Sequence, residues 1–386
     1  MSKLDELLRE LCPHGVEYKK IGKIANYEQP SKYIVESTDY NDAFDVPVLT
    51  AGQTFILGYT NESTGIFRAS KLNPVIIFDD FTGAFKWVDF SFKVKSSAMK
   101  IITASNDVSI RYLFHVMGFL HYSSNEHKRL WIGIYSEFEV PVPPLEIQRE
   151  IVRILDNFTN LTAELTAELT ARKAQYSYYR DKLLTFESRI QLLPLKDIAK
   201  FSYGYTDKAQ EHGDTRFLRI TDIAEDGTMK PEGAKYILLN DESKKYLVKK
   251  GDLLLARTGA TYGKTLYVPD NSPAVYASFL IKIELDNSKI SNRYYWHFSK
   301  SNQYRRQAEK LVSKGGQQQF NTNAVERVVV PVPPLDVQNR IVNVLDNFEK
   351  ICSDLNIGLP AEIEARQKQY EYYRDKLLTF KEVAAT

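Results

Sequence analysis

One short stretch of the sequence resembles a loop that binds phosphate groups. Residues 259–265 read GATYGKT, with a lysine and a threonine after the second glycine. The phosphate-binding loop GxxxxGK[ST] needs four residues between its glycines, whereas this stretch has three. A loop shorter by one residue does not wrap phosphates in the usual way. We therefore expect a turn or a surface loop here, and no nucleotide site.

Other catalytic patterns are absent or incomplete. Glu17-Tyr18-Lys19 has the E-x-K ending of a nuclease site, but no matching acidic residues precede it, and His127-Lys128-Arg129 is more typical of a basic loop than of a triad. There is no Asn/Asp-Pro-Pro-aromatic motif of amino methylation and no glycine-rich cofactor loop after a strand. Cys12 and Cys352 have neither metal-ligand nor disulfide-framework spacing. We predict no catalytic residues and no metal site.

Length and composition indicate a globular protein of two domains. The chain has 386 residues, of which 43% are hydrophobic. It has no apolar run of the roughly 18 residues that a membrane span needs and no signal-peptide core, so we expect a cytoplasmic protein. The net charge of +2 argues against a freestanding DNA binder. It is compatible with a binder whose partners supply many phosphate contacts.

Two blocks of sequence occur twice. PVPPLEIQREIVRILDNF (141–158) returns as PVPPLDVQNRIVNVLDNF (331–348), and ARKAQYSYYRDKLLTF (171–186) returns as ARQKQYEYYRDKLLTF (365–380). The first pair is offset by 190 residues and the second by 194. Each copy predicts a long helix.

Both predicted helices carry a heptad seam of a coiled coil. In the first copy the seam includes Leu155, Phe158, Leu165, Leu169, Tyr176 and Tyr179. In the second it includes Leu345, Phe348, Cys352, Leu355, Tyr370 and Tyr373. The second seam slips by four residues near Gly358 and Pro360, where we expect a kink or a break. Two such helices joined by a globular domain should pair antiparallel.

The first helix contains a tandem repeat, TAELTAEL, at 162–169. Each four-residue unit adds about 6 Å of helix and a rotation of about 40°. A DNA base pair rises about 3.4 Å, so one unit corresponds to one or two base pairs. A rod that changes length in such steps could measure distance along DNA.

The segments between the helices predict two mixed α/β domains. We expect helices at 4–11, 108–122 and 292–312, and short strands in stretches such as VPVLTAGQTFILGYT (46–60), PVIIFDDF (74–81) and ASFLIKIEL (277–285). The predicted boundaries are domain 1–144, helix 145–190, domain 191–334 and helix 335–386. Since the N-terminal residues are what should follow the second helix, the order is circular. The termini should lie close together, with an approximate internal two-fold axis. The fold class is therefore α+β.

This plan resembles the specificity subunit of type I restriction–modification enzymes over essentially the whole chain. PVPPLEIQREIV, PVPPLDVQNRIV and both QYxYYRDKLLTF blocks look like the conserved regions of that family, and TAELTAEL is similar to the spacer repeat of its type IC group. GDLLLARTGATYGK (251–264) and KGGQQQFNTNAVERVVVPVPPL (314–335) resemble stretches of its target recognition domains.

The resemblance implies a non-catalytic subunit that recognises double-stranded DNA. Each recognition domain would read one half of a split site, and the helices would set the gap and dock two methyltransferase subunits. Restriction–translocase subunits would join them. S-adenosylmethionine, ATP and magnesium would belong to the partners, so this chain would bind no cofactor. Because the two domains differ in sequence, the half-sites should differ.

Candidate DNA contacts are polar residues at turns and strand ends, since Arg, Lys, Asn and Gln read base edges and hydroxyl groups hold phosphates. In the first domain they are Gln53, Thr54, Thr82, Lys86, Lys128 and Arg129. In the second they are Arg219, Arg257, Thr258, Tyr262, Lys264, Lys314, Gln317, Gln318 and Gln319. Each of them is also compatible with a solvated surface. An alternative for the whole chain is a coiled-coil scaffold that binds only proteins, and a complete enzyme is disfavoured by the missing motifs.

Overall fold

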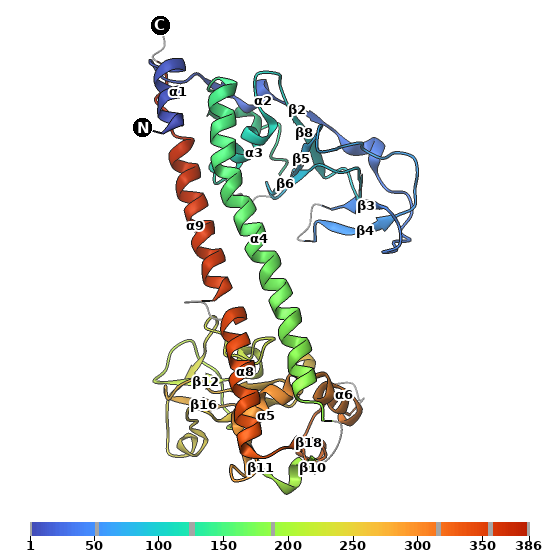
Figure 1. Ribbon diagram of the computed structural model, residues 1–386, viewed down its shortest axis with the longest axis vertical. Coiled ribbons are helices and arrows are strands. Elements are labelled where there is room, and N and C mark those ends of the chain that lie inside the picture. The colour runs from blue at the N-terminus through green and yellow to red at the C-terminus, as the bar shows by residue number, and fades with distance from the viewer. Residues whose placement is uncertain are drawn as a thin grey trace. The chain divides into compact units, whose positions relative to one another are not determined.

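The computed structural model of the chain divides into two compact units (Figure 1). It describes residues 2–50, 54–122, 128–186, 190–313, 318–353 and 358–383. Unit 1 comprises Met1–Glu164 and Ile363–Thr386, and unit 2 comprises Leu165–Glu362. The boundary on the first long helix falls inside the TAELTAEL repeat, so each unit contains one part of that helix.

The described part of unit 1 forms three sheets, with strand orders β2-β8-β5-β6, β4-β3-β7 and β1-β9. The first and third are antiparallel, whereas β3 and β7 of the second are parallel. The strands are β1 (Tyr18–Lys20), β2 (Ala25–Glu28), β3 (Val46–Leu49), β4 (Ile56–Thr60), β5 (Val75–Asp79), β6 (Phe85–Val88), β7 (Lys93–Val94), β8 (Met99–Ala104) and β9 (Glu139–Pro141).

The described part of unit 2 repeats this topology. Its sheets have the orders β11-β17-β14-β15, β13-β12-β16 and β10-β18, and β12 and β16 are again the parallel pair. The strands are β10 (Gln191–Pro194), β11 (Ala199–Tyr203), β12 (Thr215–Leu218), β13 (Tyr236–Ile237), β14 (Leu253–Ala256), β15 (Thr265–Tyr267), β16 (Ala274–Tyr276), β17 (Leu280–Leu285) and β18 (Val329–Val332). The prediction of two mixed α/β domains with one shared plan is confirmed.

The central strand β14 is apolar throughout, and β5 is apolar up to Asp79 at its end, because both faces of these strands are covered. Ile76 and Phe78 point into the cluster that contains the helices of unit 1, while Val75 and Ile77 belong to a second cluster on the other face of the sheet. Leu253–Ala256 alternates in the same way between two clusters of unit 2. Neighbouring side chains on a strand point to opposite faces, so such runs carry no polar side.

The helices of unit 1 include α1 (Lys3–Leu11), α2 (Ile21–Ile24) and α3 (Ile110–Phe119), and those of unit 2 include α5 (Asn292–Ser299), α6 (Asn302–Leu311) and α7 (Thr322–Val325). The long helices are α4 (Leu145–Leu183), α8 (Leu335–Ser353) and α9 (Leu359–Leu377). Where the seam slips, α8 ends and α9 begins, and the predicted seam residue Leu355 lies outside the described residues. No helix of the described chain is long and apolar enough to cross a membrane.

The predicted single helix over 292–312 is wrong, because α5 and α6 are separate helices. Ser301 lies between them with an extended backbone, and its hydroxyl accepts a hydrogen bond from the backbone N–H of Tyr304 (3.2 Å). A serine in this position caps the start of a new helix and satisfies a backbone donor that would otherwise have no partner.

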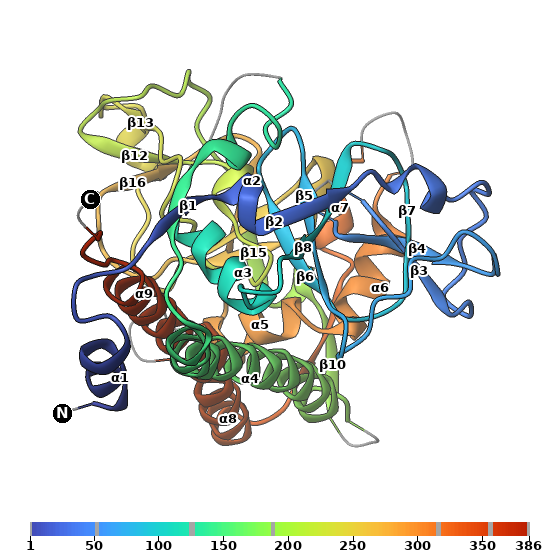
Figure 2. The same ribbon diagram turned by 90° about the horizontal axis from the view of Figure 1, so that it is seen from above.

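Within each unit, part of α4 runs antiparallel to a C-terminal helix. In unit 1, α9 lies beside the first half of α4 (Figure 1, Figure 2), and Phe158 stacks on Tyr373 with ring centroids 5.2 Å apart. Leu155, nearly one turn before Phe158, shares a buried cluster with Leu378, which follows Tyr373. In unit 2, Tyr179 of α4 stacks on Phe348 of α8 at 5.6 Å. The two stacks pair equivalent residues of the repeats in reciprocal order.

A buried histidine joins each helix pair to its domain. In unit 1, His115 of α3 lies 2.9 Å from the Asp156 carboxylate through Nε2 and 3.0 Å from the Tyr370 hydroxyl through Nδ1. A carboxylate only accepts, so Nε2 carries the proton and Nδ1 accepts from the tyrosine. Arg111 donates to the same aspartate at 2.8 Å.

Unit 2 contains the same arrangement with the repeats exchanged. His297 of α5 contacts Asp346 through Nε2 (2.7 Å) and Tyr176 through Nδ1 (3.2 Å), and Arg293 donates to Asp346 at 2.8 Å. We call each such set of histidine, aspartate, tyrosine and arginine a histidine link. Each link takes its aspartate from one repeat and its tyrosine from the other.

The glutamine in each PVPPL block fixes the start of the long helix. The buried Gln148 accepts from the backbone of Ser109 (2.8 Å) and donates to the carbonyls of Asp107 (3.0 Å) and Pro143 (2.7 Å). Gln338 makes the equivalent bonds in unit 2, to Ser291, Lys289 and Pro333. Two of the three bonds go to backbone atoms just before the domain helix, and the third goes to a proline carbonyl just before the long helix. Each glutamine therefore fastens the helix start to its domain.

The two ends of the chain meet within unit 1, as the circular order predicts. The backbone N–H of Val16 donates to the carbonyl of Lys381 (2.8 Å), and the Tyr18 hydroxyl donates to the carbonyl of Phe380 (3.1 Å). In unit 2 the corresponding segments are continuous in the chain, from the end of α4 into β10. The domain of unit 1 is therefore closed by the segment that follows α9.

Burial lowers the pKa of His297 to about 4 and also lowers the pKa of His115, although the neighbouring aspartates oppose the shift. Between pH 6.5 and 4 the unfolded chain therefore binds a proton at His297 that the folded unit does not. Stability from this group is present above pH 6.5 and is lost as the pH falls toward 4.

We predict that His297→Gln unfolds more easily than the unchanged protein at pH 7.5 but loses less stability on acidification. The buried histidine should account for about 2 kcal/mol of the loss between pH 7.5 and 5. Chemical unfolding at pH 7.5 and at pH 5 measures this loss in the free energy of unfolding of unit 2. Substitution of the exposed His212 by glutamine is the control. Equal losses in all three proteins would contradict the prediction.

Candidate nucleic-acid interface

The structure joins two loops of unit 2 that are 60 residues apart in the sequence. Arg257, at the end of β14, accepts from the backbone N–H of Phe320 (2.7 Å), and the backbone N–H of Gly259 donates to Gln318 (3.3 Å). Thr258 pairs with Gln319 in an antiparallel bridge, and the Arg257 guanidinium donates to the Gln319 side chain at 3.3 Å. The two loops therefore form one surface.

Two exposed aromatic rings complete this surface. The Arg257 guanidinium lies 5.2 Å from the ring centre of Tyr203 and 5.4 Å from that of Phe279, and its Nε donates to the carbonyl of Ser278 (3.0 Å). Tyr203 and Phe279 are 44% and 50% exposed. We call Tyr203, Arg257, Phe279, Gln318 and Gln319 the Arg257 surface.

Gly204 allows the segment that carries Tyr203 to lie close to the segment that carries Phe279. A Cβ atom at this position would lie 2.3 Å from the carbonyl oxygen of Ala277 and 2.4 Å from that of Tyr276, so no larger residue fits. The close approach lets Tyr205 and Ser278 exchange backbone bonds with the facing strand end. The sequence pattern missed Tyr203 and Phe279 because their exposure follows from this packing and not from periodicity.

The other predicted contacts of unit 2 are engaged elsewhere or lie outside the described residues. Arg219 is bound to Asp222 and to the carbonyl of Gly233, neither of which belongs to the Arg257 surface. Thr258 is buried, Tyr262 packs on Phe320, and Lys264 pairs with Glu225. Lys314 and Gln317 lie outside the described residues.

In unit 1 a buried acid occupies the place of Arg257. The carbonyl of Asp80, at the end of β5, accepts from Leu130, as that of Arg257 accepts from Phe320. Asp80 is 1% exposed and lies 3.3 Å from the buried amine of Lys100, whose other partner is Gln29. The two units therefore present different chemistry at equivalent strand ends.

The predicted contacts of unit 1 are spread over several loops. Thr82 donates to Asp79 (2.7 Å) in the turn after β5, and Lys86 is exposed on β6. Thr54, Lys128 and Arg129 are also exposed, whereas Gln53 and His127 lie outside the described residues. No described contact gathers them into one surface as in unit 2.

The predicted seam residues are buried toward the ends of α4 and less so in its middle. Leu155 and Leu345 are fully buried, while Leu165 and Leu169 in the repeat are partly exposed. Tyr176 and Tyr370 take part in the histidine links, and Phe158, Tyr179, Phe348 and Tyr373 form the stacks.

Each unit also exposes two large apolar or aromatic side chains on its helix pair. Tyr178 and Tyr372, which are equivalent in the two repeats, are 59% and 61% exposed. Leu161 and Ile351 form a second equivalent exposed pair. We call these four residues the paired strips. Exposed aromatic residues that recur on duplicated helices are typical of a surface for a protein partner.

One set of potential metal ligands occurs in the described chain: His297, Asp346 and Glu349. Glu349 is held by Arg293 and Lys300, each at 2.8 Å, and the two histidine nitrogens are used by Asp346 and Tyr176. Because these atoms are already paired with cations and hydrogen-bond partners, we interpret the cluster as part of the histidine link.

Comparison with known proteins assigns the chain to a family. The type I restriction modification DNA specificity domain matches residues 13–172 and 188–365, one match for each half of the duplication. The chain belongs to this family of specificity subunits.

The relatives agree over nearly full length. The chain is 39% identical to the specificity subunit of the type I restriction enzyme EcoR124I/EcoR124II of Escherichia coli, with 98% of each chain covered. It is 30% identical to a putative specificity subunit of Haemophilus influenzae, covering 95% of this chain and 96% of the other. The crystal structure of the S subunit from M. genitalium has the same fold, with a TM-score of 0.58 at 12% identity over 94% of this chain and 96% of that one.

Proposed function

We propose that this chain recognises a two-part DNA sequence and assembles a type I restriction–modification complex around it. Specificity subunits of this family are non-catalytic DNA-recognition subunits. The observation that carries the proposal for this chain is the duplication of one domain plan with different surfaces. One scaffold carries Arg257 and two glutamines at a strand end, whereas the other buries Asp80 there.

In this proposal residues 1–144 and 191–334 are the recognition domains, and 145–190 and 335–386 are the spacer helices. Each domain reads one half of the site. The Arg257 surface supports this role, since guanidinium and amide groups read base edges in the major groove and exposed aromatic rings pack against nucleotides. The two half-sites differ because the two surfaces differ.

The paired strips support docking of two copies of one partner. One copy would bind Tyr178 and Ile351 in unit 2. A second copy would bind the equivalent residues Tyr372 and Leu161 in unit 1. We infer that these partners are methyltransferase subunits and that restriction–translocase subunits join the complex through them. In that assembly, S-adenosylmethionine, ATP and magnesium are bound by the partners, and the complex works in the cytoplasm. A solved relative, 16% identical with a TM-score of 0.56, comes from work on complex assembly of a type I system.

The first test concerns DNA recognition by the Arg257 surface. In a complex with methyltransferase subunits, Arg257→Ala and Gln318→Ala should each weaken binding and methylation of the cognate duplex. A lost base contact costs about 1–3 kcal/mol, or roughly 5- to 150-fold. Arg327→Ala, an exposed arginine outside the surface, is the control. Full methylation by both variants would remove the loops from the interface, and a complex that shifts no duplex would favour the protein-binding scaffold.

The second test concerns partner docking. Tyr178→Ala should weaken binding of one methyltransferase copy at least tenfold and Tyr372→Ala that of the other, because an exposed tyrosine at the centre of an interface contributes about 2 kcal/mol. Native mass spectrometry of the mixtures measures the stoichiometry, and the exposed Tyr203→Ala serves as the control. If both single variants still bind two copies with unchanged affinity, the partners dock elsewhere.

The third test concerns the repeat at 162–169. Insertion of one further TAEL unit should lengthen the gap between half-sites by one or two base pairs, since it adds about 6 Å of helix. Both half-sites should be unchanged, because the domains are untouched. Methylome sequencing reads the site directly, and Ala167→Ser, which keeps the length, is the control. An unchanged gap after insertion would refute the measuring role.

A further inference from the structure

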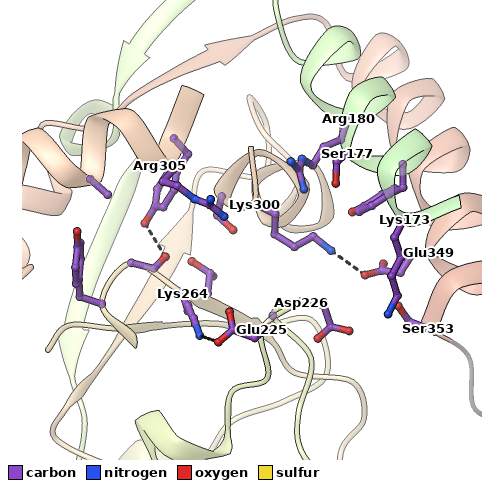
Figure 3. Close-up of a pocket in the computed structure, with 18 of the residues that line it drawn as sticks. Lys173, Ser177, Arg180, Glu225, Asp226, Lys264, Lys300, Arg305, Glu349 and Ser353 are labelled. Atoms are coloured by element: carbon purple, nitrogen blue, oxygen red, sulfur yellow. Dashed lines mark hydrogen bonds and ion pairs between the residues drawn. The ribbon is translucent and has the colours of Figure 1, made fainter. Parts of the chain in front are cut away.

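A cavity of about 660 Å³ lies within unit 2 beside the histidine link, whose Tyr176 contributes to the lining, and no residue of the Arg257 surface lines it (Figure 3). Its lining comes from α4, α6, α8, the end of α5 at 299–300, the loop at 225–227 and residues 260 and 262–265. The last segment is the GATYGKT stretch, which therefore forms one wall of a real hollow. The volume is in the range of pockets that hold small ligands or single chemical groups.

The lining carries five cations and four carboxylates, so its net charge is positive. Lys264 is paired with Glu225, and Lys300 with Glu349, as the dashed lines of Figure 3 show. By contrast, the exposed Lys173 and Arg305 side chains make no hydrogen bond or ion pair within the described chain. They come from different helices, α4 and α6, and face one hollow. Among the described residues, the cations of the lining without a partner are therefore Lys173 and Arg305. Among the carboxylates of the lining, Asp226 accepts hydrogen bonds from Thr228, and Glu309 is exposed.

The duplicated architecture does not require these cations. The offsets of the repeats place Gln367 in unit 1 at the position of Lys173. The equivalent histidines His115 and His297 likewise place Gly118 at the position of Lys300, and Thr159 stands where unit 2 has Glu349. Unit 1 forms a complete histidine link without any of these charges. They serve a purpose specific to unit 2.

The floor of the cavity is prepared for an anion. The Lys300 amine lies 3.3 Å from the ring centre of Trp296 and 2.8 Å from Glu349. Burial lowers the pKa of Lys300 to about 8, and the Glu349 charge opposes this shift. Arg180, which is 9% exposed, adds a second buried cation. An anion bound above them would favour the charged form of Lys300.

We propose that this cavity holds a phosphate group of the DNA backbone beside the half-site that unit 2 reads, with Lys173 and Arg305 as its direct contacts. The inference rests on the proposed function. It follows from the position of one short loop: residues 257–259 make the backbone contacts with 318–320 that hold the Arg257 surface together, and residues 260 and 262–265 line the cavity. In this proposal, a duplex seated on that surface would place its backbone beside the cavity. The loop is too short to wrap a triphosphate, so a single backbone phosphate fits it better than a free nucleotide.

The test is the salt dependence of DNA binding by the complex with methyltransferase subunits. Each neutralised phosphate contributes about 0.9 to the slope of log K against log salt. The Lys173→Ala, Arg305→Ala double variant should reduce the slope by about one to two and weaken binding several-fold at low salt. The methylated sequence should stay the same, since phosphate contacts carry no sequence information. Lys310→Ala, on α6 but outside the cavity, is the control and should leave the slope unchanged.

Three outcomes separate the alternatives. An unchanged slope in the double variant, with weaker binding by Arg257→Ala, would overturn this inference and leave the proposed function intact. No DNA binding by the unchanged complex would refute the proposed function itself. Calorimetry with ATP and with inorganic phosphate tests a free ligand: saturable ATP binding that the double variant loses, with an unchanged DNA slope, would reassign the cavity to a nucleotide and overturn the DNA assignment.

Discussion

The histidine link is the interaction on which the rest of the molecule depends. A buried neutral imidazole has one donor and one acceptor, and in each unit both are used, by an aspartate of one repeat and a tyrosine of the other. Leaving either partner unpaired in the interior would cost about 1–3 kcal/mol. The link thus fixes three segments at once: the domain helix, the start of one long helix and the end of the other. It explains why the two helical repeats are nearly identical while the domains are not. Asp156 and Asp346 face the same chemical partner, as do Tyr176 and Tyr370.

This constraint leaves the domain surfaces free to diverge. The strand ends that carry Arg257 and Asp80 lie away from the link, and their backbone bonds are the same in both units. The side chains differ in charge and in burial: Arg257 is partly exposed between two aromatic rings, and Asp80 is buried with Lys100. Backbone bonds hold the scaffold and side chains vary on it, which is what a subunit with two different half-sites requires.

The sequence predicted the parts of this structure that depend on local pattern. Heptad spacing and the duplicated blocks identified the helices, and apolar runs between turns identified β5 and β14. The histidines of the links escaped prediction, because one histidine in an apolar helix has no periodic signal and its partners lie far away in the chain. The break between α5 and α6 escaped as well, since a capping serine within a polar helical stretch looks like any surface residue. Arg219 shows what composition alone does not predict: an arginine at a strand end has the composition of a DNA contact, and its pairing with a nearby aspartate appears only in the structure.

The TAEL repeat, which we propose sets the distance between the half-sites, lies apart from the residues that we propose read them. The link of unit 1 uses Asp156, before the repeat, and that of unit 2 uses Tyr176, after it. Leu165 and Leu169 belong to neither of the large buried clusters of the described residues, and the alanines and glutamates of the repeat are exposed. An added unit therefore removes no buried contact, and three of its four residues, alanine, glutamate and leucine, have good helix propensity. Since both links, both stacks and both domains lie outside 162–169, the length of the helix can change without any change in the residues that read DNA.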